Sequence, residues 1–335
     1  MAFSSSRSIG KLALYVSLSV PLTSAVASLA QAPVTAKHGP TFTVAERDLP
    51  QKLSLIVYGD MRFTDPANTK DANAAARQAL VAKIASEHPD ALQLTGDVPL
   101  GGNNTADYDV YASETKVWRD DRLRVYPALG NHEFKGPDKQ GDLERWWHAF
   151  PELTGTRWYS VALGKRVYLL NLDSTSDLMP GSEQRVWLED QISHLDHSVE
   201  FVFLQLHHPP VADLQVHIEV DHNPRPNEIS LRDYLGGAAK TSRARFIVIA
   251  GHIHNYERFE RDTVTYLVSG GGGAHPYVVE RTPIDLYQDN AFPNFHYIKF
   301  VLEGKQMKAT MYRLADATAA VPEWQAKDTF LVSAK

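Results

Sequence analysis

Apolar runs of strand length alternate with amphipathic stretches through most of this chain, and this alternation constrains the fold more than any other feature. The strand-length runs begin near residues 52, 90, 124, 166, 200 and 244. Helical periodicity fills the intervals, for example with Ala76, Leu80 and Ile84 on one face. Strands that alternate with helices predict an α/β fold with largely parallel strands. After residue 262 only strand-like runs remain, which predicts a second, antiparallel sheet packed against the first.

The first residues have the composition of a secretory leader. Residues 1–11 carry two basic side chains and no acid, residues 12–27 are apolar or small, and residues 25–27 (AVA) fit a small-residue cleavage site. We therefore expect a signal peptide over residues 1–27 and a secreted or periplasmic protein. A membrane anchor is the alternative, but Pro21 and the Ser/Thr content of the segment favour cleavage.

The segments on either side of the central pattern carry less information. Residues 28–50 contain three prolines and no sustained period, which is typical of a linker or an edge segment. Residues 316–335 are expected to form a C-terminal tail. No apolar run after the leader is long enough to span a bilayer.

Charge and cysteine content exclude some classes of function. The formal charge of −6 becomes −8 when the two basic groups of residues 1–27 are removed, so we expect no nucleic-acid footprint. The chain has no cysteine, so no disulfide stabilises it and any metal site must use His, Asp, Glu or Asn. Such ligands suit Mn, Fe or Zn.

Polar side chains follow five of the predicted strands. They are Asp60, Asp97, Asn131 with His132, His207 with His208, and His252 with His254. Taken singly, a Gly-Asp pair is usually a turn and a lone His is usually a hydrogen-bonded structural residue. The carboxyl ends of strands in an α/β sheet, however, converge on one crevice. His252 and His254 are two residues apart on extended chain and point the same way, which favours a shared target such as a metal ion.

These residues stand in short motifs that resemble the calcineurin-like metallophosphoesterases. The motifs are GDMR at 59, GDVP at 96, GNHE at 130, LHHPP at 206 and GHIH at 251, in the family's order. The continuation NYER at 255, with WYSV at 158 and NLDS at 171, is most similar to purple acid phosphatases. The resemblance covers residues 52–313 and implies an α/β fold, a four-layer αββα sandwich of two mixed sheets, with the catalytic domain over residues 51–315.

The resemblance also implies a site with two transition-metal ions, Fe, Mn or Zn. Asp97 would bridge the two ions, Asp60 and His254 would bind the first, and the second would take Asn131, His207 and His252. Such a site hydrolyses phosphate esters with a metal-bound hydroxide. His132 would protonate the leaving oxygen or offset its charge, and Glu133 would orient its loop. His217 would contact substrate, the alternative being a solvated loop histidine, and His208 and His222 are expected to be structural or solvent-exposed.

Two positions depart from the family's pattern. Most members have a histidine two residues after the first aspartate, where this chain has Arg62, and purple acid phosphatases have a tyrosine where this chain has Leu100. A guanidinium only donates hydrogen bonds and cannot replace either ligand, so we expect a weak first metal site and no tyrosinate colour. Arg62 should instead project toward the metals and clamp a phosphate oxygen, the alternative being an ion pair with an acid such as Asp65.

These observations predict an exported, metal-dependent phosphoesterase that acts on small-molecule phosphate esters, foremost on phosphomonoesters. One alternative is a phosphodiesterase of the cyclic nucleotide type. The other is a non-catalytic binder of phosphate or another ligand, in which the weakened first site no longer activates water. The physiological substrate, the metal identity and the oligomeric state do not follow from the sequence.

Overall fold

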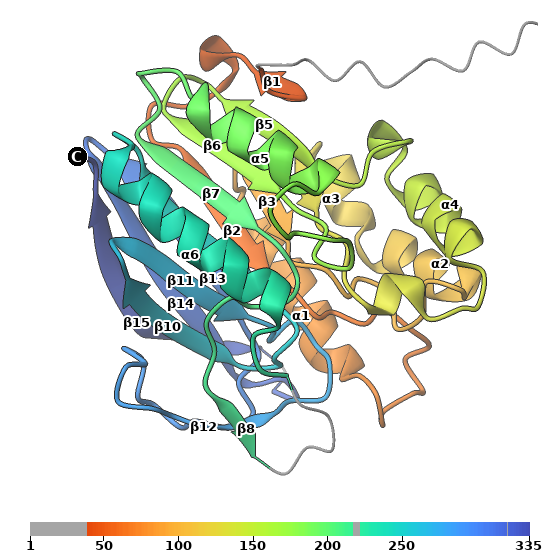
Figure 1. Ribbon diagram of the computed structural model, residues 1–335. Helices are drawn as coiled ribbons and strands as arrows, with labels where there is room; N and C mark the ends of the chain where they lie inside the picture. Colours follow the sequence, from red (N-terminus) through yellow and green to blue (C-terminus); the bar gives the residue numbers. More distant parts are fainter. Residues whose placement is uncertain (1–38, 217–221, 320) are drawn as a thin grey trace, which may run out of the picture. The chain divides into compact units, whose positions relative to one another are not determined.

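The computed structural model describes residues 39–216, 222–319 and 321–335, and two β-sheets form the centre of this part (Figure 1). One sheet has seven strands in the order β1 (Phe42–Val44), β5 (Tyr159–Leu163), β6 (Val167–Asn171), β7 (Phe201–Gln205), β9 (Arg245–Ala250), β11 (Val264–Ser269) and β10 (Tyr256–Arg261). The other has six strands in the order β15 (Glu323–Ser333), β14 (Gln306–Asp316), β13 (His296–Glu303), β2 (Ser54–Tyr58), β3 (Ala91–Leu94) and β4 (Val125–Pro127). A separate two-stranded ribbon pairs β12 (Val278–Glu280) with β8 (Leu214–Val216).

Helices pack against the outer side of each sheet. Helices α5 (Glu183–Ser193) and α6 (Pro226–Thr241) cover the seven-stranded sheet, where Leu188, Leu231 and Leu235 join the buried cluster formed by Leu170 and Val202 (Figure 1). The helices on the six-stranded side are α1 (Ala74–Ser86), α2 (Thr105–Glu114), α3 (Lys116–Asp120) and α4 (Lys139–Ala149), and short 3-10 turns lie at Glu46–Asp48, His132–Phe134 and Pro151–Leu153. The predicted four-layer αββα sandwich is confirmed.

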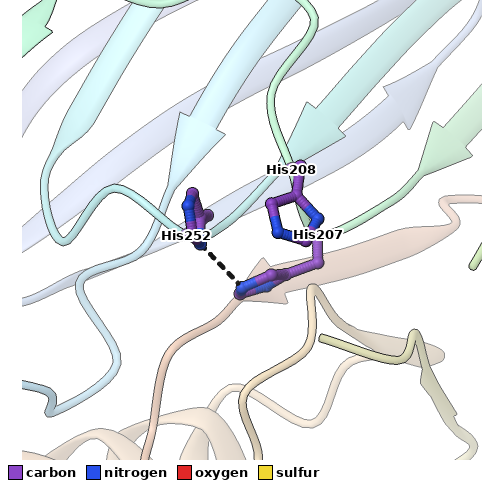
Figure 2. A group of neighbouring side chains, drawn as sticks. All are labelled: His207, His208 and His252. Carbon is purple, nitrogen blue, oxygen red and sulfur yellow. Dashed lines mark hydrogen bonds between the residues drawn. The ribbon is translucent and has the colours of Figure 1, made fainter. Parts of the chain in front are cut away.

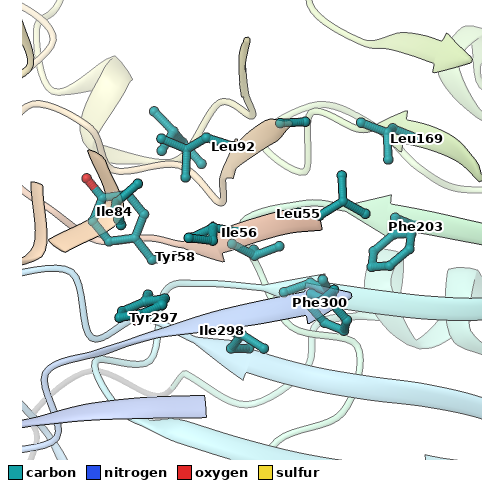
Figure 3. Packing of buried hydrophobic residues seen from close by; sticks show 14 of the residues in the cluster. Leu55, Ile56, Tyr58, Ile84, Leu92, Leu169, Phe203, Tyr297, Ile298 and Phe300 are labelled. Atoms are coloured by element: carbon teal, nitrogen blue, oxygen red, sulfur yellow. The ribbon is translucent and has the colours of Figure 1, made fainter. Parts of the chain in front are cut away.

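In the central strands, successive side chains pack on opposite faces of the sheet, and both faces are buried. On β6 and β7, Leu169 and Phe203 face the space between the sheets, whereas Leu170 and Leu204 face the helices. Phe203 meets Phe300 of β13 across the core, with ring centroids 5.0 Å apart and nearly perpendicular planes (Figure 3). Burial on both faces explains why these strands are continuous apolar runs rather than alternating ones.

The division of strands between the sheets differs from the expected one. We predicted one parallel sheet followed by a separate C-terminal sheet, but β2, β3 and β4 lie in the same sheet as the C-terminal β13 and β14. The link is an antiparallel pairing of β13 with β2, in which Ile298 lies opposite Val57. Apolar runs show where strands are but not which strand pairs with which, because their side chains fit many neighbours equally well.

The two terminal segments of the described chain also form strands. Within the predicted linker or edge segment 28–50, β1 pairs in parallel with β5 at one edge of the seven-stranded sheet. The predicted tail 316–335 contains β15, which is antiparallel to β14 and is therefore part of the six-stranded sheet. The predicted leader 1–27 lies outside the described residues. No helix in the described ranges has both the length and the apolar character needed to cross a bilayer.

Glu87 ties the end of α1 to strand β13. Its carboxylate accepts hydrogen bonds from Lys299 Nζ at 2.5 Å and from the Tyr297 hydroxyl at 3.2 Å, and it pairs with Lys83 at 2.6 Å. Partial burial opposes ionisation, but the bonds from Lys299 and Lys83 outweigh it and lower the pKa of Glu87 to about 2. A carboxylate whose pKa is lower in the folded state stabilises the fold above its unfolded pKa, and this contribution is lost as the pH falls through the folded pKa.

We expect Glu87→Gln to lower the free energy of unfolding at pH 7 by roughly 1 kcal/mol, a modest value because solvent screens a partly exposed pair. The difference from wild type should shrink as the pH falls from about 5 toward about 3. Urea unfolding across this pH range measures it, with the exposed Glu152→Gln as a control. A difference that stays constant over the range would contradict the role of these ion pairs.

Candidate metal centre

Loops at the carboxyl ends of β3, β4, β7 and β9 bring four atoms that can bind a metal ion close to one point. His207 Nε2 lies 3.2 Å from Asp97 Oδ1, 3.1 Å from Asn131 Oδ1 and 3.2 Å from His252 Nδ1. Figure 2 shows the ring of His207 turned toward that of His252. Both sheets contribute, since Asp97 and Asn131 follow strands of the six-stranded sheet and the histidines follow strands of the seven-stranded one.

The hydrogen bond on the other side of His207 determines what this cluster can bind. His207 Nδ1 lies 2.9 Å from the carbonyl oxygen of Thr95, which can only accept, so the ring proton is on Nδ1. The lone pair of Nε2 therefore faces a carboxylate oxygen, an amide oxygen and a second imidazole nitrogen. Acceptors that converge in a buried site repel one another unless a cation lies between them. The residues present therefore fit a metal ion.

A second pair of acceptors lies beside the first cluster. His254 Nε2 is 3.5 Å from Asp60 Oδ1, and both atoms are buried without a hydrogen-bond partner among the residues that the structure describes. His254 Nδ1 donates to the carbonyl of His275, so its lone pair is also on Nε2. Burial, followed by the nearby charge of Asp97, raises the pKa of Asp60 to about 8 in the absence of a cation. A metal ion at this point would satisfy both atoms and stabilise the carboxylate.

The charge states of His252, His254 and Asp97 suit metal binding. Burial holds the pKa of His252 and His254 well below the usual range, so both rings are neutral and can act as ligands. Burial opposes the ionisation of Asp97, but its neighbours, among them the Arg62 guanidinium and the backbone N–H of His132, hold its pKa well below the usual range. Asp97 is therefore a carboxylate that lies against both clusters.

The backbone at the strand ends adopts strained conformations, and these direct the side chains toward the centre. Asp60, Asp97 and His252 have φ values of 60°, 53° and 71°, in a region that residues other than glycine rarely adopt. Gly130 is required beside them, since a Cβ there would lie 2.4 Å from Asp97 Oδ1. Glu133 holds the loops as expected: its carboxylate accepts from the backbone N–H groups of Asp97 (3.1 Å), Val98 (2.8 Å) and Gly130 (2.7 Å).

His132 lies beside the centre without joining either cluster. Its backbone N–H donates to Asp97 Oδ1 at 2.9 Å, and its Nε2 is 3.8 Å from Asp97 Oδ2. Its Nδ1 donates to the carbonyl of Leu100, which leaves Nε2 as the atom facing the centre. Burial lowers the pKa of His132 to about 3, so the ring is neutral until an anion binds next to it.

The side chain of Arg62 reaches the cluster around Asp97. Its Nη2 is 3.5 Å from Asp97 Oδ2, the carboxylate oxygen that does not face His207, and its side chain is 15% exposed. Its φ of 48° is again in the left-handed region, which aims the side chain inward. The guanidinium thus adds a positive charge next to the carboxylate that lies against both clusters.

The structure also locates aromatic and histidine side chains that the sequence did not identify as part of the site. The ring centroid of His208 is 4.4 Å from that of His252, and the ring of His222 is 4.5 Å from it. Tyr277 stacks on His254 with centroids 4.0 Å apart. No motif marks His222 or Tyr277, and only their contacts reveal them. His217, predicted to contact substrate, lies outside the described residues.

The fold and this geometry define an αββα sandwich with a buried centre suited to two cations. The chain belongs to the calcineurin-like phosphoesterase family, which residues 53–256 match. The match ends within the GHIH continuation and includes all six candidate ligands, Asp60, Asp97, Asn131, His207, His252 and His254.

Comparison with individual proteins agrees with this assignment. The chain is 28% identical over 142 residues to probable purple acid phosphatase 20 of Arabidopsis thaliana, a match that covers 42% of this chain and 30% of that protein. The chain therefore spans less than a third of this relative's length. The fold is similar to that of a purple acid phosphatase from yellow lupin (Lupinus luteus) seeds, with a TM-score of 0.67, 17% identity and coverage of 84% of this chain and 54% of the other. It is also similar to GAP50, the anchor in the inner membrane complex of Plasmodium, with a TM-score of 0.57, 13% identity and coverage of 85% and 89%.

Proposed function

We propose that the protein is an exported, metal-dependent phosphoesterase that acts mainly on phosphomonoesters. The observation that carries this proposal is the convergence of carboxylate, amide and imidazole acceptors on the lone pair of His207 Nε2, at distances of 3.1 to 3.2 Å. Asp97, Asn131, His207 and His252 would hold one ion, and Asp60, His254 and Asp97 would hold the other. Bound in this way, a pair of divalent or trivalent ions lowers the pKa of a water molecule and polarises phosphate oxygens. Export rests on the composition of residues 1–27 alone.

The chain's own residues supply positioning and charge around such a substrate. Arg62 offers N–H donors next to the centre, and a guanidinium can bind two phosphate oxygens at once. His132 Nε2 faces the same space, and the negative charge of a bound phosphate would raise its pKa and allow it to protonate a leaving oxygen. The rings of His222 and Tyr277 pack against those of His252 and His254.

Metal analysis followed by a comparison of two substrates tests the proposal. Purified protein should contain close to two transition-metal ions per chain when Mn, Zn or Fe is supplied, and should hydrolyse p-nitrophenyl phosphate faster than bis(p-nitrophenyl) phosphate. Faster cleavage of the diester would favour a phosphodiesterase. Failure to hydrolyse either ester with any of the three metals would contradict the enzymatic proposal.

The second candidate function is a phosphate or ligand binder without catalysis. The observation in its favour is Arg62, whose guanidinium lies 3.5 Å from Asp97 Oδ2 and places a positive charge where a second cation would need the carboxylate. A binder would hold one metal ion per chain, bind inorganic phosphate, and show no turnover at saturating metal.

Replacing Arg62 with histidine should change metal binding and substrate binding in opposite directions. Arg62→His removes a positive charge and adds a ligand, so metal affinity at the Asp60–His254 pair should rise. The Michaelis constant for p-nitrophenyl phosphate should rise by about ten-fold, because a charge-assisted bond to phosphate is lost. Metal retained after dialysis and steady-state kinetics measure the two effects, with Arg145→His, a change in an ion pair on α4, as the control. If neither quantity changes, Arg62 has a structural role only.

A further inference from the structure

A cavity of about 590 Å³ lies next to the metal centre and shares Asn131 with it. Its polar lining comes from separate segments of the chain and includes Asn131, Lys139, Arg157, Thr175, His208 and Arg225. Three of these side chains are cationic, and none of the lining residues in the described part of the chain is acidic. A concave surface with several cations and no carboxylate favours an anionic occupant.

Hydrogen bonds to buried carboxylates hold the side chains of Arg157 and Arg225 in place. Arg157 Nε donates to Asp173 Oδ2 at 2.7 Å, and its guanidinium stacks on the Phe134 ring, 5.2 Å from the centroid. Arg225 donates to Glu228 through Nε at 2.9 Å and to the Ser174 carbonyl at 2.6 Å. Asp173 and Glu228 are fully buried, whereas the arginine side chains remain 34% and 42% exposed. For both arginines, Nη1 has no partner among the described residues, so each guanidinium presents a fixed donor to a ligand.

His208 adds a further donor, because its hydrogen bonds place the ring proton on Nε2. Ser174 Oγ accepts from the backbone N–H groups of His207 at 3.3 Å and His208 at 3.0 Å. Its own proton is then free to go only to His208 Nδ1, which lies 2.9 Å away. The neutral ring of His208 therefore carries its proton on Nε2. Although His208 lies close to His207 and His252 (Figure 2), it lines the cavity as a hydrogen-bond donor.

Lys139 completes the set at the outer side of the cavity. It is the first residue of α4, it is exposed, and its ammonium group bonds to the carbonyl of Phe134. One bond to a carbonyl leaves the charge of the ammonium group uncompensated and two of its protons available. The cavity therefore combines an ammonium group, two oriented guanidinium groups and one imidazole N–H beside the proposed site of phosphate cleavage.

We propose that this cavity binds a second phosphate group of the substrate, so that the preferred substrates are small phosphate esters whose alcohol part carries another phosphate. The inference rests on the proposed phosphoesterase function, because it needs a first phosphate at the metal centre. A simple monoester such as p-nitrophenyl phosphate would occupy the metal centre and leave the cavity to solvent.

The test compares fructose 1,6-bisphosphate, fructose 6-phosphate and p-nitrophenyl phosphate. Wild-type protein should show a kcat/KM for the bisphosphate about ten-fold above that for the monophosphate, the gain expected from charge-assisted hydrogen bonds. Lys139→Gln and Arg157→Gln should each remove most of this preference, and should change kcat/KM for p-nitrophenyl phosphate by less than about two-fold. The control is Arg166→Gln, which also breaks a partly exposed ion pair, with Glu200, but lies at the opposite end of β6.

Three outcomes separate failure of the inference from failure of the proposed function. Equal kcat/KM for the two fructose phosphates in wild-type protein would overturn the inference, as would an unchanged preference in both variants. Because Arg157→Gln leaves the buried Asp173 without its cationic partner, Lys139→Gln, at an exposed position, carries the test if the arginine variant fails to fold. If wild-type protein hydrolyses no ester, the proposed function fails instead. Calorimetric titration with fructose 1,6-bisphosphate then decides the inference, which requires tighter binding to wild type than to Lys139→Gln.

Discussion

Asp97→Asn should reduce metal content and phosphoesterase activity together. The side chain keeps its size and its acceptor for the His132 N–H, but a neutral amide cannot offset the charge of two neighbouring cations. We expect kcat/KM to fall by more than about 100-fold. Mutation of a residue that only hydrogen-bonds to a metal ligand already lowers metal affinity or activity by about 10- to 100-fold, and Asp97 is proposed to be a ligand itself. Elemental analysis and p-nitrophenyl phosphate hydrolysis on the same preparation measure both quantities.

The matched control for this variant is Asp142→Asn. Asp142 is also a buried carboxylate that accepts a backbone N–H, from Gly136 at 2.9 Å, but it pairs with Arg145 on α4 and lies in neither candidate cluster. Its substitution should leave metal content unchanged. Full activity of Asp97→Asn at wild-type metal loading would show that Asp97 does not bridge the ions.

His132→Ala should leave metal content nearly intact and lower turnover by about 10² to 10⁴, the range for loss of a general acid. The loss should be smaller for p-nitrophenyl phosphate than for an alkyl phosphate such as glycerol phosphate, because p-nitrophenolate leaves without needing a proton. His88→Ala, a histidine outside the centre, is the control. An equal loss for good and poor leaving groups would argue that His132 binds or orients the substrate rather than donating a proton.

Much of the centre was accessible from the sequence because each candidate ligand directly follows a buried strand. Asp60, Asp97 and His207 come after buried, largely apolar strands, and the carboxyl ends of such strands meet in space. Arg62 was expected to point toward the metals from its spacing alone, and its contact with Asp97 agrees with this. The αββα architecture came from the resemblance, which the family match supports.

Other features depend on contacts that no short stretch of the sequence indicates. Strand β15 was missed because polar and charged residues interrupt the apolar ones in its sequence, EWQAKDTFLVS, and only Val332 is buried in it. The cavity next to the centre was missed for a different reason. Lys139, Arg157 and Arg225 are far apart in the chain and each has an ordinary surface composition around it, so only the packing of α4, β5 and α6 brings them together.

The pairing of β2 with β13 has a consequence for how the chain reaches this structure. Residues 54–58 leave the ribosome long before residues 296–303, so the strand at the centre of the six-stranded sheet has no partner on one side during most of synthesis. Pairings between such distant segments slow folding and leave an unpaired strand edge exposed. The candidate ligands are divided in the same way, since Asp60 and His254 meet only when both sheets are present. Metal capture should therefore be a late event, and a nascent or truncated chain should depend on chaperones rather than on metal to stay unaggregated.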